Sequence, residues 1–261
     1  MLRFSANLTW LFNEVPFLDR FTTAARAGFA AVEFASPYEH APGAIEERLR
    51  SNDLAVSVFN LPAGNWAAGD RGMACDPVRV GEFQDSVGWA LEYAGPLGCS
   101  TLHAMAGLRP PGAREEAMRE TYLSNLRFAG RELANRGMRL VIEAINTRDM
   151  PSYYLTTSRQ AFEIIRDADV ENLFFQYDAY HLQIVEGDLT STLKRELARI
   201  GHIQIADVPG RHEPGTGEIN YNFLLRQIER LGYRGWIGCE YRPLTTTEAG
   251  LGWMRRFEEG E

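Results

Sequence analysis

Short apolar runs recur along the chain, and each is followed by a longer stretch in which apolar residues have helical spacing. Runs such as RLVIEAI and HIQIA are short and β-branched, which is typical of strands buried on both faces of a parallel sheet. Strands are predicted near Phe4–Leu8, Ala31–Ala35, Leu54–Asn60, Ser100–Met105, Arg139–Ala144, Leu173–Asp178, His202–Ala206 and Gly235–Glu240. Helices are predicted between them, near Pro16–Ala27, Gly43–Ser51, Val78–Leu97, Arg114–Arg136, Ser158–Asp167, Leu189–Ile200 and Tyr221–Leu231.

This alternation predicts one α/β domain, a single (β/α)8 TIM barrel over residues 1–261. Eight strand–helix units average about 33 residues each, close to the ~250 residues typical of this fold. The rival is a doubly wound open sheet, which usually has a glycine-rich turn after its first strand, whereas the segment ANLTWLFNEVP contains no glycine. The long irregular stretch Leu61–Pro77 is the exception to the even spacing, and a loop of this length is usually functional or disordered.

Charge and composition narrow the function classes. The chain has 27 basic and 35 acidic residues, and Lys194 is its one lysine. Lys194 lies in the helical run STLKREL, away from any predicted strand end, so Schiff-base chemistry inside a barrel is disfavoured. A net charge of -8 without a clustered basic run argues against nucleic acid or an anionic membrane surface as a partner.

Cysteine usage and the N-terminal segment predict a cellular setting. Cys75, Cys99 and Cys239 are odd in number and widely spaced, which supports neither a disulfide framework nor a four-cysteine zinc site. The chain shows no signal-peptide pattern and no apolar run of about 18 residues, the length that a spanning helix needs. We therefore expect a cytoplasmic protein without a membrane association.

Four successive predicted strands each end near an oxygen-bearing side chain, at Glu143, Asp178, Gln204 and Glu240. Catalytic groups of a TIM barrel lie at the C-terminal ends of its strands. If these four side chains point into the barrel, strand alternation turns their mostly apolar neighbours outward, against the helices: Ile142, Tyr177, Ile203, Ile205 and Cys239. The inward and outward faces of the strands are therefore consistent with each other, and the four polar residues are predicted to converge inside the barrel.

Three converging carboxylates repel one another in a protein interior unless a cation neutralises them. Three carboxylates and one amide oxygen are hard donors, which favour Mg²⁺ or Mn²⁺ over zinc or copper. The sequence therefore predicts a divalent metal site made by Glu143, Asp178, Gln204 and Glu240. The alternative is that one or two of these residues support the ligands or only end a strand.

The segments VIEAIN (141–146), QYDAYH (176–181), HIQIADVPGRHEPGTGEINY (202–221) and GCEY (238–241) resemble the hydroxypyruvate isomerase family, a branch of the xylose isomerase-like TIM barrels. In the wider group the third metal position is commonly histidine, and Gln204 matches the hydroxypyruvate isomerase branch. The resemblance implies the same four metal ligands, with Glu143 and Glu240 also acting as the acid–base pair. It further implies interconversion of hydroxypyruvate and tartronate semialdehyde through an enediolate.

Other residues rank below these four. By similarity, His181 is expected to contact a substrate oxygen, and Arg211 suits the carboxylate of a 2-oxo acid because its guanidinium binds in a bidentate way. Each also has a structural alternative, as a brace for Asp178 and as a solvated loop arginine. The remaining candidates lie at strand ends, in the strands or in the long loop: Asn7, Glu33, Asn60, Trp66, Arg71, His103, His202 and Asp207. We expect His202 to be a hydrogen-bonded core histidine.

Other functions remain open at this point. The nearest are a 2-oxo-tetronate isomerase and a ketose 3-epimerase built on the same barrel. A barrel endonuclease with several zinc ions needs more histidine than the five scattered here, and a sugar-binding barrel without activity would not need both glutamates. The sequence leaves open which divalent metal binds, which glutamate is the base in each direction, and whether the chain forms a homo-oligomer.

Overall fold

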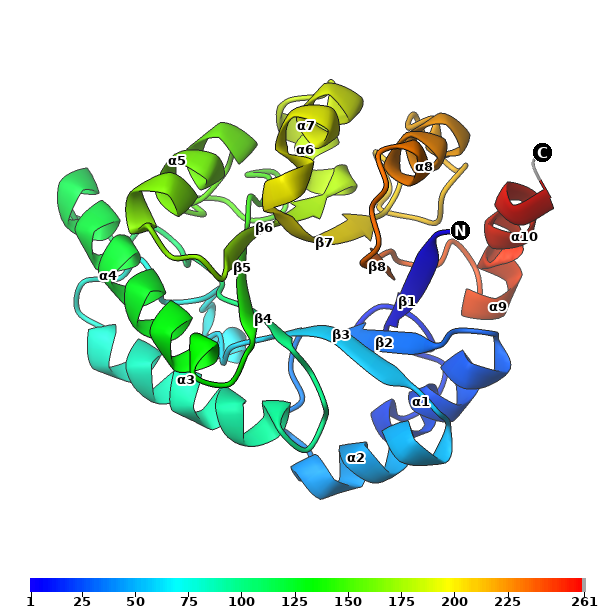
Figure 1. The fold of residues 1–261 in the computed structure, drawn as a ribbon, viewed down its shortest axis with the longest axis horizontal. Helices are drawn as coiled ribbons and strands as arrows, with labels where there is room; N and C mark the ends of the chain where they lie inside the picture. The colour runs from blue at the N-terminus through cyan, green and yellow to red at the C-terminus, as the bar shows by residue number, and fades with distance from the viewer. Residues whose placement is uncertain (260–261) are drawn as a thin grey trace.

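Eight parallel strands pair in chain order, and the last pairs with the first to close a barrel (Figure 1). The computed structural model describes residues 1–259. The strands are β1 (Arg3–Asn7), β2 (Ala31–Phe34), β3 (Ala55–Asn60), β4 (Thr101–His103), β5 (Arg139–Glu143), β6 (Leu173–Asp178), β7 (Ile200–Ile205) and β8 (Trp236–Cys239). The predicted (β/α)8 barrel is confirmed.

Helices surround the barrel and cover the outer face of its strands (Figure 1). They are α1 (Phe17–Arg26), α2 (Pro42–Ser51), α3 (Val80–Ala94), α4 (Glu115–Ala134), α5 (Ser158–Ala168), α6 (Ala179–Val185), α7 (Leu189–Glu196), α8 (Tyr221–Arg230), α9 (Thr247–Gly250) and α10 (Gly252–Glu259), with short 3-10 turns η1 (Trp66–Ala68) and η2 (Leu197–Arg199).

Most predicted elements are present, with differences at their ends. The predicted helix Leu189–Ile200 is too long, because the chain leaves α7 at Glu196, passes through η2, and already enters β7 at Ile200. Three helices were not predicted from the sequence: α6, α9 and α10. Helix α6 begins directly after β6, and its first turn is stabilised by Asp178, whose Oδ1 accepts a hydrogen bond from the Tyr180 backbone N–H at 2.8 Å. Asp178 therefore both ends a strand and caps a helix.

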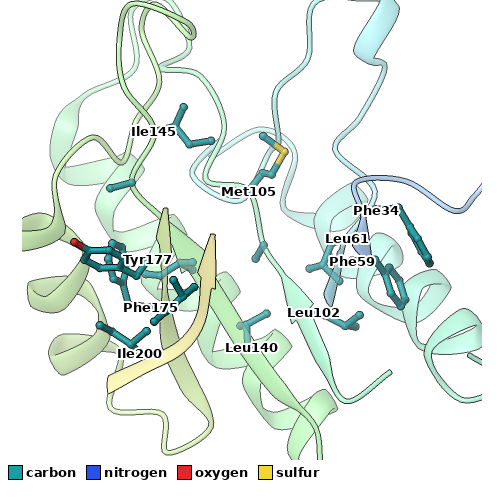
Figure 2. Close-up of a cluster of buried hydrophobic side chains, with 14 of the residues drawn as sticks. Phe34, Phe59, Leu61, Leu102, Met105, Leu140, Ile145, Phe175, Tyr177 and Ile200 are labelled. Carbon is teal, nitrogen blue, oxygen red and sulfur yellow. The ribbon is translucent and has the colours of Figure 1, made fainter. Parts of the chain in front are cut away.

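The apolar core lies between the strands and the helices. Ile142, Tyr177, Ile203, Ile205 and Cys239 are all buried within it, as strand alternation predicts. Figure 2 shows part of this layer, with Phe175, Tyr177 and Ile200 grouped on one side of the strands. Each such buried aromatic or aliphatic side chain stabilises the fold by about 1.5–3 kcal/mol. The core therefore holds the strands in register and leaves their inward-facing residues free for polar functions.

Cys75, Cys99 and Cys239 are buried free thiols. Among the described residues, no helix combines the length and the apolar character needed to cross a lipid bilayer.

Candidate active site

A cavity of about 130 Å³ opens where the C-terminal ends of the strands meet. Five of the six predicted site residues line it: Glu143, His181, Gln204, Arg211 and Glu240. The sixth, Asp178, is buried beside it, with its Oδ2 3.5 Å from both His181 Nε2 and Arg211 Nη2. The fold thus brings all six together. Glu143 and Asp178 end their strands, Gln204 is the penultimate residue of β7, and Glu240 is the first residue after β8.

Glu143 and Asp178 form the part of the site best suited to a cation. Their Oε1 and Oδ2 atoms are buried, and neither has a hydrogen-bond partner within residues 1–259. These two carboxylates and His181 each offer a ligand atom within 4.8 Å of the others. Burial, then the charges of Asp178 and Glu240, raise the pKa of Glu143 well above its ordinary value, and burial raises that of Asp178. Hard, unsatisfied oxygens that repel one another fit a divalent cation.

Gln204 and Glu240 face the same cavity but have hydrogen-bond partners. Gln204 Oε1 accepts from Gln176 Nε2 at 2.8 Å. Glu240 Oε2 accepts from Arg211 Nη2 at 2.6 Å, and its Oε1 accepts from Asn7 Nδ2 at 3.1 Å. Burial raises the pKa of Glu240 to about 8, although Arg211 acts in the opposite direction. Ligation of a metal by these two residues therefore stays a prediction.

His181 is oriented as a hydrogen-bond donor to the cavity. Asn146 Oδ1 accepts from the backbone N–H groups of Arg148 and Asp149, which turns its Nδ2 toward His181 Nδ1 at 2.7 Å. His181 Nδ1 must then accept, so the ring proton lies on Nε2, which faces Asp178 and Glu143. Burial, followed by Arg211, lowers the pKa of His181 well below its usual value, so the ring is neutral. This tautomer suits a substrate contact better than metal ligation.

His103 presents the opposite tautomer to the same cavity. Its Nδ1 lies 3.1 Å from Asn60 Oδ1, an acceptor, and therefore carries the proton. Its Nε2 is buried, lies 3.7 Å from Glu143 Oε2, and makes no hydrogen bond in the described part of the chain. Burial, then His202, lowers the pKa of His103 to about 3, so Nε2 is a free acceptor. His103, which the sequence offered only as a weaker strand-end candidate, thus faces the site directly.

Arg211 is held over the cavity by an ordered loop. Asp207 anchors that loop by accepting hydrogen bonds from four backbone N–H groups, those of Val208, Gly215, Gly217 and Ile219. The Arg211 guanidinium lies 4.8 Å from the ring centroids of both Trp10 and Tyr180, and it pairs with Glu240 and Asp178. This placement lets a planar cation meet an anionic ligand in the cavity.

Sequence reasoning missed Gln176 and Asn146. Gln176 Nε2 donates to both Glu143 Oε2 and Gln204 Oε1, at 3.1 and 2.8 Å, and so links two predicted ligands. Gln176 lies two residues before Asp178 on β6, and strand alternation alone would have placed it on the same inward face. Asn146 orients His181, and no simple pattern signals this role, since the residue lies in an irregular segment after β5.

A model of the xylose isomerase-like TIM barrel family matches residues 21–257. The chain belongs to this family. Solved structures include one described as AP endonuclease, family 2, from Brucella melitensis, which is 46% identical with a TM-score of 0.96 and 98% of each chain covered. A 3-keto-D-glucoside 4-epimerase from E. coli, 20% identical with a TM-score of 0.81 over 98% of this chain and 99% of the other, shares the fold.

Curated relatives define the branch within the family. A 2-oxo-tetronate isomerase of Cupriavidus necator is 51% identical over 98% of this chain and 99% of its own length. A hydroxypyruvate isomerase of Escherichia coli is 50% identical over 97% of this chain and 98% of its own. The resemblance to hydroxypyruvate isomerases that the sequence segments carry is therefore confirmed, and the chain is an enzyme.

Proposed function

We propose that the protein is an isomerase that moves the carbonyl group between C2 and C3 of a short hydroxy-oxo acid, interconverting hydroxypyruvate and tartronate semialdehyde. The observation that carries this proposal is a pair of carboxyl groups, the buried Glu143 and the partly buried Glu240, that line one small cavity and both have raised pKa values. With a pKa of about 8, Glu240 can both take and return a proton at working pH, and the raised pKa of Glu143 favours the same exchange, which suits the pair to general acid–base catalysis.

The cavity offers a complementary group for each part of hydroxypyruvate. Arg211, whose guanidinium faces the cavity, would bind the substrate carboxylate through two N–H groups. His181 Nε2–H is a donor for the C2 carbonyl oxygen, and His103 Nε2 is an acceptor for the C3 hydroxyl. The two histidine tautomers thus match a substrate with one acceptor oxygen and one donor oxygen on neighbouring carbons.

The reaction needs a proton to leave one carbon and another to reach its neighbour. One glutamate takes the proton from C3, and the electron pair of the broken C–H bond forms the C2–C3 double bond of an enediolate. The second glutamate delivers a proton to C2, while the C3 oxygen becomes the carbonyl. The hydroxyl proton passes from the C3 oxygen to the C2 oxygen, and the histidines face these two atoms. Each well-placed acid or base contributes about 10²–10⁴-fold to such a rate.

A divalent metal, Mg²⁺ or Mn²⁺, is part of this proposal. Glu143 and Asp178 would hold it through their unsatisfied oxygens, with Gln204 and Glu240 completing the set. When bound, such an ion stabilises negative charge on the two substrate oxygens.

A second candidate substrate is 2-oxo-tetronate, which carries one more hydroxymethyl group on C3 and undergoes the same C2–C3 exchange. The cavity favours this option because it shares Thr9, Trp10, Asn60, Trp66 and other residues with an outer cleft of about 730 Å³. A substituent on C3 therefore has space to extend. The curated 2-oxo-tetronate isomerase at 51% identity supports the same reading.

The test is to assay purified protein with Mg²⁺ or Mn²⁺ on hydroxypyruvate, 2-oxo-tetronate and a neutral ketose. Activity on hydroxypyruvate supports the first proposal, and a kcat/KM at least tenfold higher on 2-oxo-tetronate would replace it with the second. Activity on the neutral ketose alone would contradict both, because Arg211 would then have no carboxylate to bind.

A further inference from the structure

Glu33 on β2 is a buried carboxylate outside the predicted ligand set. Its side chain is fully buried and accepts four hydrogen bonds. Asn7 Nδ2 and Gln204 Nε2 donate to Oε1 at 3.0 and 2.8 Å, while Ser57 Oγ and His202 Nε2 meet Oε2 at 3.0 and 2.7 Å. The donors come from three different strands, β1, β3 and β7, so Glu33 joins residues that lie far apart in the sequence. His202 is the hydrogen-bonded core histidine that the sequence predicts.

Both carboxylate oxygens of Glu33 act as hydrogen-bond acceptors, since each faces two donors. Burial alone would raise its pKa, but the His202 imidazole and the hydrogen bonds from His202, Gln204 and Asn7 bring the pKa below its ordinary value. An amide side chain has one end that donates and one that accepts. A carboxylate therefore attracts the NH₂ end of Gln204 and turns its oxygen the other way, toward Gln176 and the cavity.

The same carboxylate also acts on Glu240 through Asn7. Asn7 Oδ1 accepts from the Thr9 backbone N–H at 3.0 Å, which fixes the direction of its amide. Asn7 Nδ2 is then shared between Glu33 Oε1 and Glu240 Oε1, at 3.0 and 3.1 Å. Two of the four predicted ligands, Gln204 and Glu240, are thus connected to one carboxylate that does not itself belong to the set.

The barrel has space reserved for this carboxylate. Gly238 on β8 pairs in register with Gln204 and Ser5. A Cβ atom at Gly238 would lie 2.3 and 2.4 Å from the two Glu33 carboxylate oxygens, closer than any real contact. Only glycine at this position leaves Glu33 room to reach its four donors.

We propose that Glu33 is a positioning residue of the metal site, which orients the Gln204 amide so that its oxygen is available as a ligand and aligns Glu240 through Asn7. This inference rests on the metal site of the proposed function. Groups that orient metal ligands typically change metal affinity by about 10–100-fold when they are removed.

The test compares Mn²⁺ affinity, measured by calorimetry without substrate, in wild type and Glu33→Gln. Glutamine has the same shape but can donate to Gln204 Oε1 and so stabilise the flipped amide. We expect Mn²⁺ affinity to fall about 10–100-fold, with the circular dichroism spectrum unchanged. Ser57→Ala is the matched control, since it removes one donor to Glu33 and touches neither Gln204 nor Asn7, and we expect its Mn²⁺ affinity to stay within about threefold of wild type.

Gln204→Glu in the Glu33→Gln background separates orientation from general damage. A carboxylate presents oxygen on both sides, so amide direction no longer matters, and Mn²⁺ affinity should return to within about threefold of wild type. A purely structural role for Glu33 would leave the double variant as weak as the single one, which would overturn the proposal. If Glu33→Gln does not fold, Glu33→Asp replaces it, because its shorter carboxylate retreats from Gln204 and should also weaken Mn²⁺ binding.

Wild-type affinity in Glu33→Gln, or in Glu33→Asp where that variant is used, overturns this inference but leaves the metal site intact. No Mn²⁺ binding by wild type overturns the metal site and this inference together. The two failures are therefore distinguishable.

Discussion

Glu33 and Glu143 are both buried carboxylates on the inner face of the barrel, yet their surroundings are opposite. Glu33 accepts four hydrogen bonds, and its pKa is lowered despite burial. Glu143 accepts one from Gln176 on Oε2, and within residues 1–259 its Oε1 has none. Burial and the neighbouring charges of Asp178 and Glu240 raise its pKa well above normal.

The contrast indicates how one barrel supports two uses of the same side chain. A carboxylate whose lone pairs are satisfied stays ionised and fixes its neighbours, as Glu33 does. One with unsatisfied oxygens is costly to keep ionised and gains from a cation or a proton. Substitutions at and around these carboxylates distinguish the two uses.

Replacing either member of the proposed acid–base pair should have the greatest effect. Glu143→Gln and Glu240→Gln each remove a proton acceptor, and we expect kcat to fall by about 10²–10⁴-fold. Because Glu143 has an unsatisfied buried oxygen, its variant should unfold at the same or a higher urea concentration than wild type. Steady-state kinetics and urea unfolding check both parts. A kcat within threefold of wild type in both variants would contradict the mechanism.

Replacing Arg211 should affect substrate binding more than turnover. Arg211→Lys keeps the charge but loses the bidentate geometry, and a charged hydrogen bond is worth about 1.5–3 kcal/mol. We expect KM for hydroxypyruvate to rise about 10–100-fold. Arg109→Lys is a control, because Arg109 pairs with Glu115 on the protein surface. An unchanged KM in Arg211→Lys would remove Arg211 from the carboxylate site.

Filling the space beside Glu33 should destabilise the fold. Gly238→Ala places a methyl group against the carboxylate, and such overpacking typically costs about 1–3 kcal/mol. Gly43→Ala is a matched control, since a Cβ there meets no atom within 4 Å and its φ lies outside the left-handed region. Chemical denaturation measures both. Equal stability of Gly238→Ala and wild type would show that Glu33 is not confined as described.

The two kinds of carboxylate should also give opposite pH dependences of stability. The folded-state pKa of Glu240 is about 8 against an ordinary 4.5, so the metal-free protein should lose stability as pH rises from about 4.5 to 8. Glu33 has a lowered pKa and should contribute stability above about pH 4.5 that is lost as pH falls. Urea unfolding at a series of pH values gives the free energy of unfolding as a function of pH. Above pH 4.5 this free energy should change less steeply in Glu240→Gln than in wild type, and Glu33→Gln should show no such flattening. A slope in Glu240→Gln as steep as that of wild type would contradict this assignment.

Much of the barrel and the four strand-end residues follow from local patterns, whereas His181 was expected from the family resemblance and Arg211 from the carboxylate of a 2-oxo acid. Alternation along strands such as VIE and HIQIA separates inward oxygens from outward apolar residues, and the structure places Glu143, Gln204, Ile142 and Ile203 accordingly. The Glu33 network could not be predicted in this way. Glu33 and His202 are 169 positions apart and meet only because the barrel closes between distant strands. The tautomers of His103 and His181 likewise depend on Asn60 and Asn146, whose side-chain directions are set by tertiary contacts.

The central claim is that two glutamates, acting on neighbouring carbons, move a proton by exchange with solvent. It is tested most directly by converting hydroxypyruvate in D₂O and following the product by proton NMR, with an enzyme-free sample to subtract spontaneous exchange. Two-base transfer predicts tartronate semialdehyde that carries deuterium at C2, and enzymatic product formation that is about 10²–10⁴-fold slower in Glu143→Gln or Glu240→Gln. A product that retains the substrate's own hydrogen at C2 would contradict the account.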